Sequence, residues 1–501
     1  MRWEMRTVVS CVCVFLVTAS IATATPPTKT EVQQALDKAI SFYHKNASHH
    51  GGYVWKYSDD LQYGIGEGVA TKDMIWIQPP GTPAVGEAFL EAYRISKNPA
   101  HLKAARDVAD ALVKTQLQSG GWYYHAHFDP AKRNLFSYRD QPKIKLPKAG
   151  PGYVGGWDEW RKRRYKKNIS LLDDDVTSAS LRLLMQVDQV LDFKDKAIRE
   201  AVDYGLKAVA RAQYPVGAWS HNYDRFPIIT PDPKHYPVKK ASFPENWSRK
   251  WDRAFSGCYS INDRITPNVT KLYLLAHQIY KKDSYLETAK RGGQFFILAQ
   301  MPDPQPSWAQ QYNRDMHPVW DRPFEPPAIT GFESQDVLET LLQLYRHTGE
   351  KRFLEPVPKA IRYMRKSTLP NGKLARFYEL KTNRPLYFDK RYQLTYDGSA
   401  SPDHYGFQFP SRLDDIEREY DRLKKLPNSE LAKEPPLRLP KDLSGQVEKI
   451  VATMDKRGAW LEPGFVRNLQ GRKVVPKAGI ISSQTFIDNV HTLCLYLQSD
   501  D

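Results

Sequence analysis

The sequence contains few cysteines, four among 501 residues. Cys11 and Cys13 lie in an N-terminal apolar segment, so Cys258 and Cys494 remain as one possible disulfide, and their spacing does not decide whether they pair. No other apolar run is long enough to span a bilayer, which argues against a transmembrane segment in the mature chain. A Walker loop, zinc-finger spacing and an RNA-binding motif are also missing, so no sequence motif indicates nucleic-acid binding.

The first residues have the pattern of a secretory signal. Arg2 and Arg6 precede an apolar run from Val8 to Val17, and Ala22-Thr23-Ala24 offers a small-residue cleavage site. We therefore predict that residues 1–24 are removed and that the mature protein is soluble, monomeric, and secreted or periplasmic. The full sequence has a formal net charge of +16, and a surface with such an excess of positive charge attracts polyanions. For an exported protein, an acidic polysaccharide is the expected partner rather than nucleic acid.

A helical repeat organises most of the chain. Apolar residues recur at helical spacing over 84–116, 177–213, 266–300 and 333–367, each range reading as a helix pair followed by a turn rich in Gly or Pro. Weaker units lie at 51–55 and 457–460. Stacked helix pairs of this kind predict an all-α fold, an α/α toroid (incomplete α/α barrel). Inner helices are expected to begin within 80–84, 173–177, 262–266, 330–334 and 482–486, all on one rim around a common cleft. The turn tryptophans, Trp122, Trp219 and Trp460, are expected to pack between helix pairs rather than to stack on sugars.

Four segments follow from this pattern. Residues 1–24 are the signal, and 25–168 hold N-terminal helix pairs with a basic insertion that includes Arg161–Lys167. Residues 169–410 form the expected catalytic part. Residues 411–501 hold a charged helix, a Pro-rich link and closing C-terminal helices.

The stretch from Met316 to Ser334 concentrates charge beside rigid backbone. Arg322 lies between Asp321 and Glu325, and a Pro-Pro pair precedes an expected helix start at Thr330. This order predicts that Arg322 reaches the positive end of a helix, where anions bind readily. An ordinary salt bridge within a loop is the alternative.

A set of short motifs occurs in a fixed order over about 169–388. The motifs are Leu172-Asp-Asp-Asp-Val-Thr177, Ala212-Gln-Tyr-Pro-Val-Gly-Ala-Trp219, Tyr259-Ser-Ile-Asn-Asp263, Trp308-Ala-Gln-Gln311, Arg322-Pro-Phe-Glu-Pro-Pro327 and Ala375-Arg-Phe-Tyr-Glu379 followed by Thr382-Asn-Arg-Pro385. In this order they resemble the motifs of the pectate lyases of polysaccharide lyase family 10. They cover less than half of the chain, and only the ordered set is specific.

The resemblance implies cleavage of a galacturonan-like polysaccharide by β-elimination, with Ca²⁺ helping to hold the substrate. Removing the proton beside a uronate carboxylate builds up negative charge there, which a cation must stabilise. Arg322 corresponds to the family's catalytic arginine, as the base at C5 or as a charge stabiliser, and an arginine pKa above about 12 favours the second role. Asp173 and Asp263 correspond to site acids that act in catalysis or hold calcium. For both, capping a helix is the structural alternative.

The remaining candidates are expected to bind substrate. Arg376 and Arg384 are the residues suited to grip uronate carboxylates, because a guanidinium can bind a carboxylate through two hydrogen bonds. Thr177, Asn262 and Trp308 fall in the matching motifs and are also expected to contact substrate. Two further residues near the predicted rim, His317 and Lys373, are second-line candidates.

The sequence leaves two other functions open. A glycoside hydrolase on the same scaffold would use two facing carboxylates, drawn from Asp173, Asp263 and Glu333. A non-catalytic binder of acidic glycans would keep the cleft without the chemistry. The motifs depart from the family pattern at Asp174-Asp175, at Arg264 and at Gln311-Tyr312. The spacing of His125, His127 and Asp129 is metal-like, but no further ligand lies nearby in sequence, and chance is the preferred interpretation.

Overall fold

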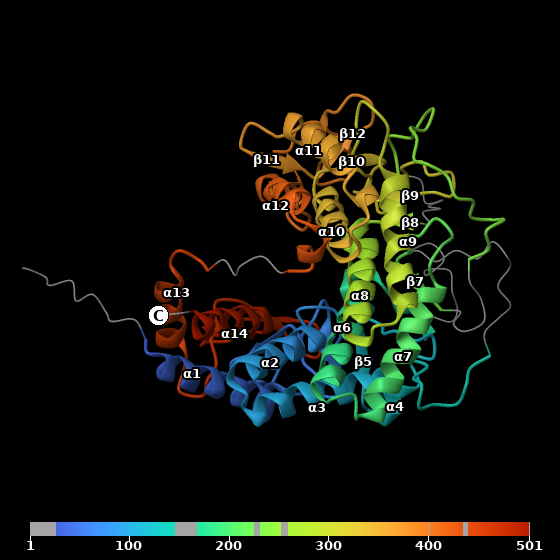
Figure 1. Ribbon diagram of the computed structural model, residues 1–501. Helices are drawn as coiled ribbons and strands as arrows, with labels where there is room; N and C mark the ends of the chain where they lie inside the picture. The colour runs from blue at the N-terminus through green and yellow to red at the C-terminus, as the bar shows by residue number, and fades with distance from the viewer. Residues whose placement is uncertain are drawn as a thin grey trace, which may run out of the picture.

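Helices that stack side by side in an open arc make up most of the protein (Figure 1). The computed structural model describes residues 27–145, 168–224, 231–251, 259–399, 401–433 and 439–499. The predicted signal at 1–24, the basic run at 161–167 and Cys258 lie outside these residues. Cys494 is buried as a free cysteine among the described residues, and whether it pairs with Cys258 stays open. No helix within the described ranges is long and apolar enough to cross a membrane.

The helices alternate between an inner and an outer layer. The inner helices pack in the order α14, α2, α6, α8 and α10, and outer helices cover them, with α3 on α2, α7 on α6 and α9 on α8. The bounds are α1 (Lys29–Phe42), α2 (Thr82–Ser96), α3 (Pro99–Thr115), α4 (Pro130–Arg133), α6 (Val176–Val190), α7 (Lys196–Arg211), α8 (Ile265–Tyr280), α9 (Asp283–Ala299), α10 (Glu333–Thr348), α11 (Val357–Lys366), α12 (Leu413–Lys425), α13 (Leu443–Thr453) and α14 (Ser483–Gln498).

The predicted toroid is therefore confirmed as an incomplete ring. Figure 1 shows α13 and α14 at one end of the arc and α10, α11 and α12 at the other, with the ends standing apart. The N-termini of α2, α6, α8, α10 and α14 all fall inside the predicted ranges. Helical periodicity located them well because each helix buries one face. In α7, the buried residues are spaced three and four apart: Ile198, Ala201, Val202, Gly205, Leu206, Ala208 and Val209.

Short antiparallel strands line the connections between helices, a feature that helical periodicity did not predict. Their bounds are β1 (Lys56–Ser58), β2 (Gly64–Ile65), β3 (Val69–Ala70), β4 (Met74–Trp76), β5 (His125–His127), β6 (Ser170–Leu171), β7 (Asn222–Tyr223), β8 (Tyr259–Ser260), β9 (Gln311–Tyr312), β10 (Ala328–Thr330), β11 (Lys373–Ala375), β12 (Phe377–Glu379), β13 (Pro385–Phe388), β14 (Leu394–Thr395), β15 (Gln408–Pro410), β16 (Leu461–Glu462), β17 (Val466–Arg467), β18 (Lys473–Val474) and β19 (Ile480–Ser482). The sheet β16-β19-β1-β2-β3 joins the two ends of the chain, with Lys56 opposite Ser482. Such pairing ties α14 to the N-terminal part.

The turn tryptophans hold successive helix pairs together. Each indole N–H donates to a carbonyl at the end of the preceding outer helix: Trp122 to Leu112, Trp219 to Val209, Trp308 to Phe296 and Trp460 to Ile450, at 2.8–2.9 Å. The indole thus adds a hydrogen bond to a carbonyl in the last turn of each helix, where the regular backbone partners run out. In three turns a glycine two residues before the tryptophan has φ of +101° to +103°, which side chains with a Cβ rarely adopt. Packing between helix pairs, the predicted role of Trp122, Trp219 and Trp460, is confirmed.

Candidate active site

Two inner helices begin with the same unusual turn. Before α6, Asp174 and Asp175 have φ of 49° and 60°, and before α8, Asp263 and Arg264 have φ of 47° and 62°. Left-handed backbone is uncommon outside glycine but is enriched at Asp and Asn, which explains why aspartates occupy these turns. The helix N-cap residues are Asp175 and Arg264, and neither side chain caps its helix by a hydrogen bond to the first backbone N–H groups. Capping by Asp173 or Asp263, the structural alternative, is therefore wrong.

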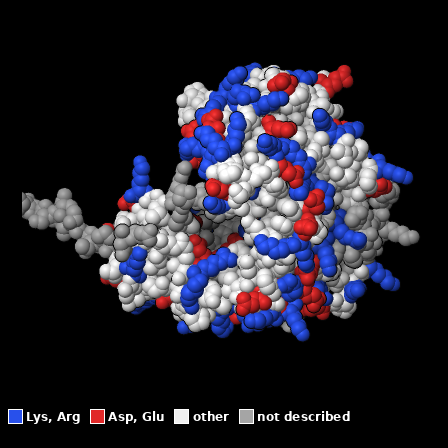
Figure 2. Space-filling model, viewed as in Figure 1, with Lys and Arg blue, Asp and Glu red and all other residues white. Residues whose placement is uncertain are grey.

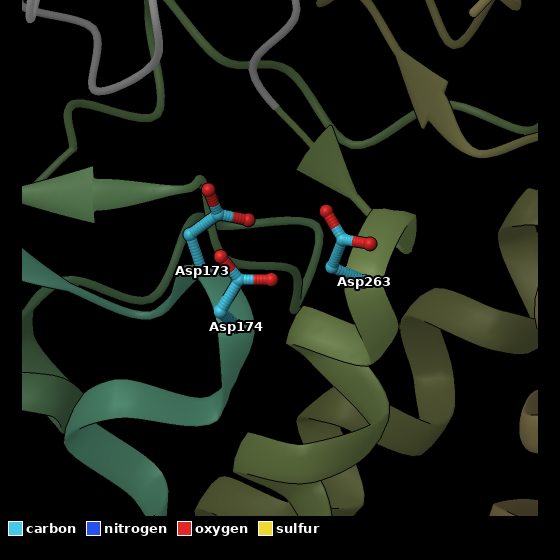
Figure 3. Close-up of side chains that lie close together, drawn as sticks. All are labelled: Asp173, Asp174 and Asp263. Atoms are coloured by element: carbon cyan, nitrogen blue, oxygen red, sulfur yellow. The ribbon is translucent and has the colours of Figure 1, made fainter. Parts of the chain in front are cut away.

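These turns bring three carboxylates together. One oxygen from each of Asp173, Asp174 and Asp263 lies within 4.8 Å of the others. Figure 3 shows Asp173 and Asp174 at the start of α6 facing Asp263 at the start of α8. Asp173 is buried, and its Oδ1 has no hydrogen-bond partner among the described residues. Carboxylates this close repel one another unless a proton or a cation lies between them.

The three carboxyl groups differ in their proton affinity. Burial and then the charge of Asp263 raise the pKa of Asp173 to about 7. Burial, with Asp173 and Asp263 beside it, raises the pKa of Asp174 to about 9. For Asp263, burial favours the neutral form, but the Arg322 guanidinium outweighs it and lowers the pKa of Asp263. At neutral pH without a cation, the cluster therefore keeps Asp263 ionised and Asp174 protonated, while Asp173 is divided between the two forms.

Arg322 is fixed beside the cluster by two acids. Its guanidinium donates to Asp263 Oδ2 at 2.7 Å and to Glu325 Oε2 at 2.7 Å. Burial opposes its charge, but Glu325 and Asp263 outweigh burial and raise the pKa of Arg322. The predicted pairing within the loop is thus only half of the arrangement. Asp321 turns instead to His221, with Oδ2 at 2.8 Å from Nε2, and that buried pair lies under Asp173, whose backbone N–H donates to the His221 carbonyl at 3.1 Å.

Glu325, offered by the sequence only as a partner in an ordinary loop salt bridge, is the buried anchor of Arg322. Its side chain is fully buried and accepts from Arg322, from Asn262 Nδ2 at 3.1 Å and from the Tyr405 hydroxyl at 2.8 Å. A buried carboxylate needs such partners to stay charged. Its place three residues after Arg322 was the available signal, whereas Tyr405 lies too far along the chain to be connected to it by spacing.

A cleft of about 470 Å³ opens at this point. Its lining includes Arg322, Asp173 and Asp174 together with Glu67, Gly68, Trp76, Tyr123, Tyr124 and His125. Figure 2 shows one face of the molecule hollowed between the two ends of the arc, with acidic side chains visible inside. The prediction that Arg322 and Asp173 share one cleft is confirmed. His125 lies on the wall of this cleft.

Two further residues hold the carboxylates in place. The Tyr124 hydroxyl donates to Asp173 Oδ2 at 2.9 Å. The Gln78 amide donates to Asp174 Oδ2 at 2.8 Å and to Glu67 Oε1 at 3.2 Å, while Gln78 Oε1 accepts from the Trp76 indole at 3.1 Å. Both residues come from the segment before the catalytic part expected from the motifs, and no local pattern marked them.

The two candidate carboxylate-binding arginines differ in position. Arg376 is buried, lies 3.4 Å from Glu333 Oε1 and stacks on Tyr405 at 4.1 Å. Burial opposes its charge, but Glu333 and then other nearby charges, Asp263 among them, raise the pKa of Arg376. Arg384 is exposed and stacks on Tyr396 at 3.3 Å, outside the lining of the cleft. Arg376 is thus near the acidic cluster, and Arg384 is not placed there. His317 and Lys373 are not in the lining either.

Three residues predicted to contact substrate are fully buried. The Thr177 hydroxyl accepts the Trp122 backbone N–H at 3.2 Å. Asn262 bridges Glu325 and Gln310. Trp308 has no exposed surface. Their side chains therefore support the site from behind. The prediction that these three residues contact substrate directly is wrong, because their side chains are not accessible.

Replacing Trp308 by alanine is expected to lower the free energy of unfolding by about 3–5 kcal/mol, because a large buried side chain and its hydrogen bond are lost. Trp308→Phe should cost less, since the ring volume is mostly kept. Urea denaturation measures both. Leu469→Ala, at a residue that is 64% exposed, serves as the control and should change stability by about 0.5 kcal/mol or less. A stable Trp308→Ala protein with weakened glycan binding would restore the substrate-contact role.

Fold and site together define an α/α toroid with a carboxylate-lined cleft at the N-termini of its inner helices. No protein-family model and no curated protein matches the sequence. Among solved structures, the chain is similar to a family 10 polysaccharide lyase from Cellvibrio cellulosa, at 16% identity, 68% coverage of this chain, 98% of the other and a TM-score of 0.43. It is also similar to the cellobiose 2-epimerase of Bacillus thermoamylovorans, at 13% identity, with 94% of this chain and 98% of the other covered and a TM-score of 0.46. A third similar structure is the GH76A α-1,6-mannanase of Salegentibacter, at 11% identity, with 93% of this chain and 100% of the other covered and a TM-score of 0.40. At TM-scores below 0.5 these similarities assign neither a family nor an activity.

Proposed function

We propose that this protein is a polysaccharide lyase that cleaves an acidic, galacturonan-like polysaccharide by β-elimination, with Ca²⁺ held at the rim. The observation that carries the proposal is the placement of Arg322 in one cleft with Asp173 and Asp174, directly against Asp263. A fixed cation and a cluster of oxygen ligands are what elimination beside a uronate carboxylate requires.

The residues of the cluster fit calcium. Ca²⁺ prefers carboxylate oxygens, and Asp173, Asp174 and Asp263 offer one each within 4.8 Å. Asp173 Oδ1 is buried and finds no hydrogen-bond partner in the described parts of the chain, a need that a cation would satisfy. When bound, the ion would bridge to uronate oxygens and offset their charge. It would also displace the protons that the cluster otherwise keeps.

Arg322 acts in this scheme as a charge stabiliser and not as the base. Its pKa is raised by Glu325 and Asp263, so the guanidinium stays protonated and cannot accept the C5 proton. Glu325 and Asp263 also fix its orientation, so that it meets the carboxylate of a bound uronate without reorganising. Tyr124 and Asp173, joined at 2.9 Å, hold a proton at the cleft wall. In this scheme the Asp173 carboxylate, in its ionised form, accepts the C5 proton, and the Tyr124 hydroxyl protonates the leaving glycosidic oxygen. The proton on Asp173 then passes to Tyr124 across their hydrogen bond, which restores both groups.

A glycoside hydrolase is the second candidate, favoured by one observation. Asp173 has a pKa raised to about 7 while Asp263 has a lowered pKa, and groups pushed apart in this way can serve as acid and ionised partner. Their separation, within 4.8 Å, is close to the spacing of about 5–5.5 Å used by retaining glycosidases.

The ultraviolet absorbance of unsaturated uronates separates these functions. Purified protein is mixed with a panel of acidic polysaccharides, with Ca²⁺ or with chelator, and both absorbance and reducing ends are followed. The expected result is a rise in absorbance that chelator suppresses. New reducing ends without absorbance would replace the lyase by the hydrolase. Retained glycan binding with neither signal would leave a non-catalytic binder.

A further inference from the structure

An aromatic wall shares the cleft with Arg322. It is built from Trp76, Tyr123, Tyr124 and His125, which all belong to the lining. Trp76 and His125 lie opposite each other on β4 and β5, with ring centroids 5.2 Å apart. Tyr123 meets His125 edge-on at 5.5 Å and Tyr124 at 5.3 Å. Trp76 is buried, whereas the other three rings are partly exposed. The wall thus presents ring surface that is already ordered.

Charge on this side of the cleft is negative or absent. Glu67 is exposed at the rim, and Gln78 joins it to Asp174. Burial, followed by repulsion from His127, lowers the pKa of His125 to about 4, so this ring is neutral at pH 7. Among the described residues that line the cleft, Arg322 is the one Lys or Arg. A carboxylate bound against the wall would therefore meet Glu67 nearby, and the wall itself offers it no Lys or Arg.

We propose that the aromatic wall is a subsite for an uncharged pyranose, adjacent to the uronate held at Arg322. The inference rests on the proposed function and specifies its substrate class, a polymer in which a uronate neighbours an uncharged sugar unit. Aromatic rings stack on the apolar face of a sugar, and Glu67 can accept hydrogen bonds from its hydroxyls. Two sources share this chemistry, a neutral sugar and a uronate whose carboxylate is methyl-esterified.

Binding measured by isothermal titration tests the subsite without turnover. The protein carries Arg322→Lys to slow the reaction, and the ligands are oligouronates that are fully charged, partly methyl-esterified, or alternating with a neutral sugar. Tyr123→Ala should weaken binding of the last two about tenfold, whereas Tyr123→Phe, which keeps the ring, should leave it nearly unchanged. Glu67→Lys should shift the preference toward fully charged oligouronates. Comparing the partly methyl-esterified oligouronate with the one that alternates with a neutral sugar shows which of these two uncharged units the wall binds more tightly.

Tighter binding of the fully charged oligouronate by the otherwise unchanged wall would overturn the subsite, as would equal losses in Tyr123→Ala and Tyr123→Phe. The elimination assay on protein with Arg322 intact keeps the two proposals distinct. Elimination with no effect of Tyr123→Ala on any ligand would overturn the subsite alone. Selective loss of the uncharged ligands without any unsaturated product would overturn the lyase and leave the subsite standing.

Discussion

Replacing Arg322 by alanine is expected to lower kcat for elimination by about 10²- to 10³-fold, because the group that offsets the developing charge is removed. Arg322→Lys should retain part of the activity, since it keeps the charge but cannot reproduce the guanidinium contacts with both Glu325 and Asp263. Initial rates of absorbance increase, at saturating substrate and calcium, measure the loss. KM measured in parallel shows whether ground-state binding is also affected.

The same substitution also leaves Glu325 buried without its cation, which costs about 3–5 kcal/mol of stability. A matched control separates that cost from catalysis. Arg199→Ala removes an arginine that lies 2.8 Å from the fully buried Asp188 and that does not line the cleft. It should lower stability comparably and leave kcat unchanged. Full activity in a folded Arg322→Ala protein would remove Arg322 from the mechanism.

In the presence of chelator, the unfolding free energy is expected to fall as pH rises from about 4 to about 9. Asp173 and Asp174 have pKa values raised to about 7 and about 9, so the folded state binds more protons than the unfolded chain across this window. Stability falls with rising pH wherever that holds. A folded-state pKa that lies one pH unit above the unfolded value contributes about 1.4 kcal/mol to the free energy of unfolding, and this contribution is lost as the pH rises. Calcium should reverse the trend, because its carboxylate ligands must be deprotonated. Melting temperatures at three pH values, with chelator or with calcium, measure both effects.

Asp174→Asn is the discriminating variant. In chelator at high pH it should melt about 2 °C or more above the natural protein, because one of the repelling carboxylates is gone. It should also lose most of the stabilisation by calcium. Asp192→Asn, at a side chain that is 78% exposed, should match the natural protein in both conditions. Equal stabilisation of Asp174→Asn and the natural protein by calcium would place the ion elsewhere.

The sequence predicted the helices and the rim better than it predicted the roles of side chains. Inner helices such as α6 and α8 were located because apolar spacing and turn residues are local signals. Asp173, Asp263 and Arg322 were found through short motifs and do lie together. Trp308 was assigned to substrate although it is buried, because a motif position does not reveal which way a side chain points. Gln78 and Tyr405 reach the site from distant segments, and only the folded chain brings them there.

The paired turns before α6 and α8 show which position at the start of an inner helix can carry either charge. The backbone is the same in both turns, yet one carries Asp175 where the other carries Arg264. That position therefore tolerates opposite charges while the helix start keeps its geometry. Arg264 forms an ion pair with Asp336, with Nε 3.2 Å from Oδ2. Asp175 forms an ion pair with Arg182, with Oδ2 3.2 Å from Nη2. The charge carried by the last residue of this turn can thus be reversed without rebuilding the start of the helix, provided that a residue of opposite charge lies beside it.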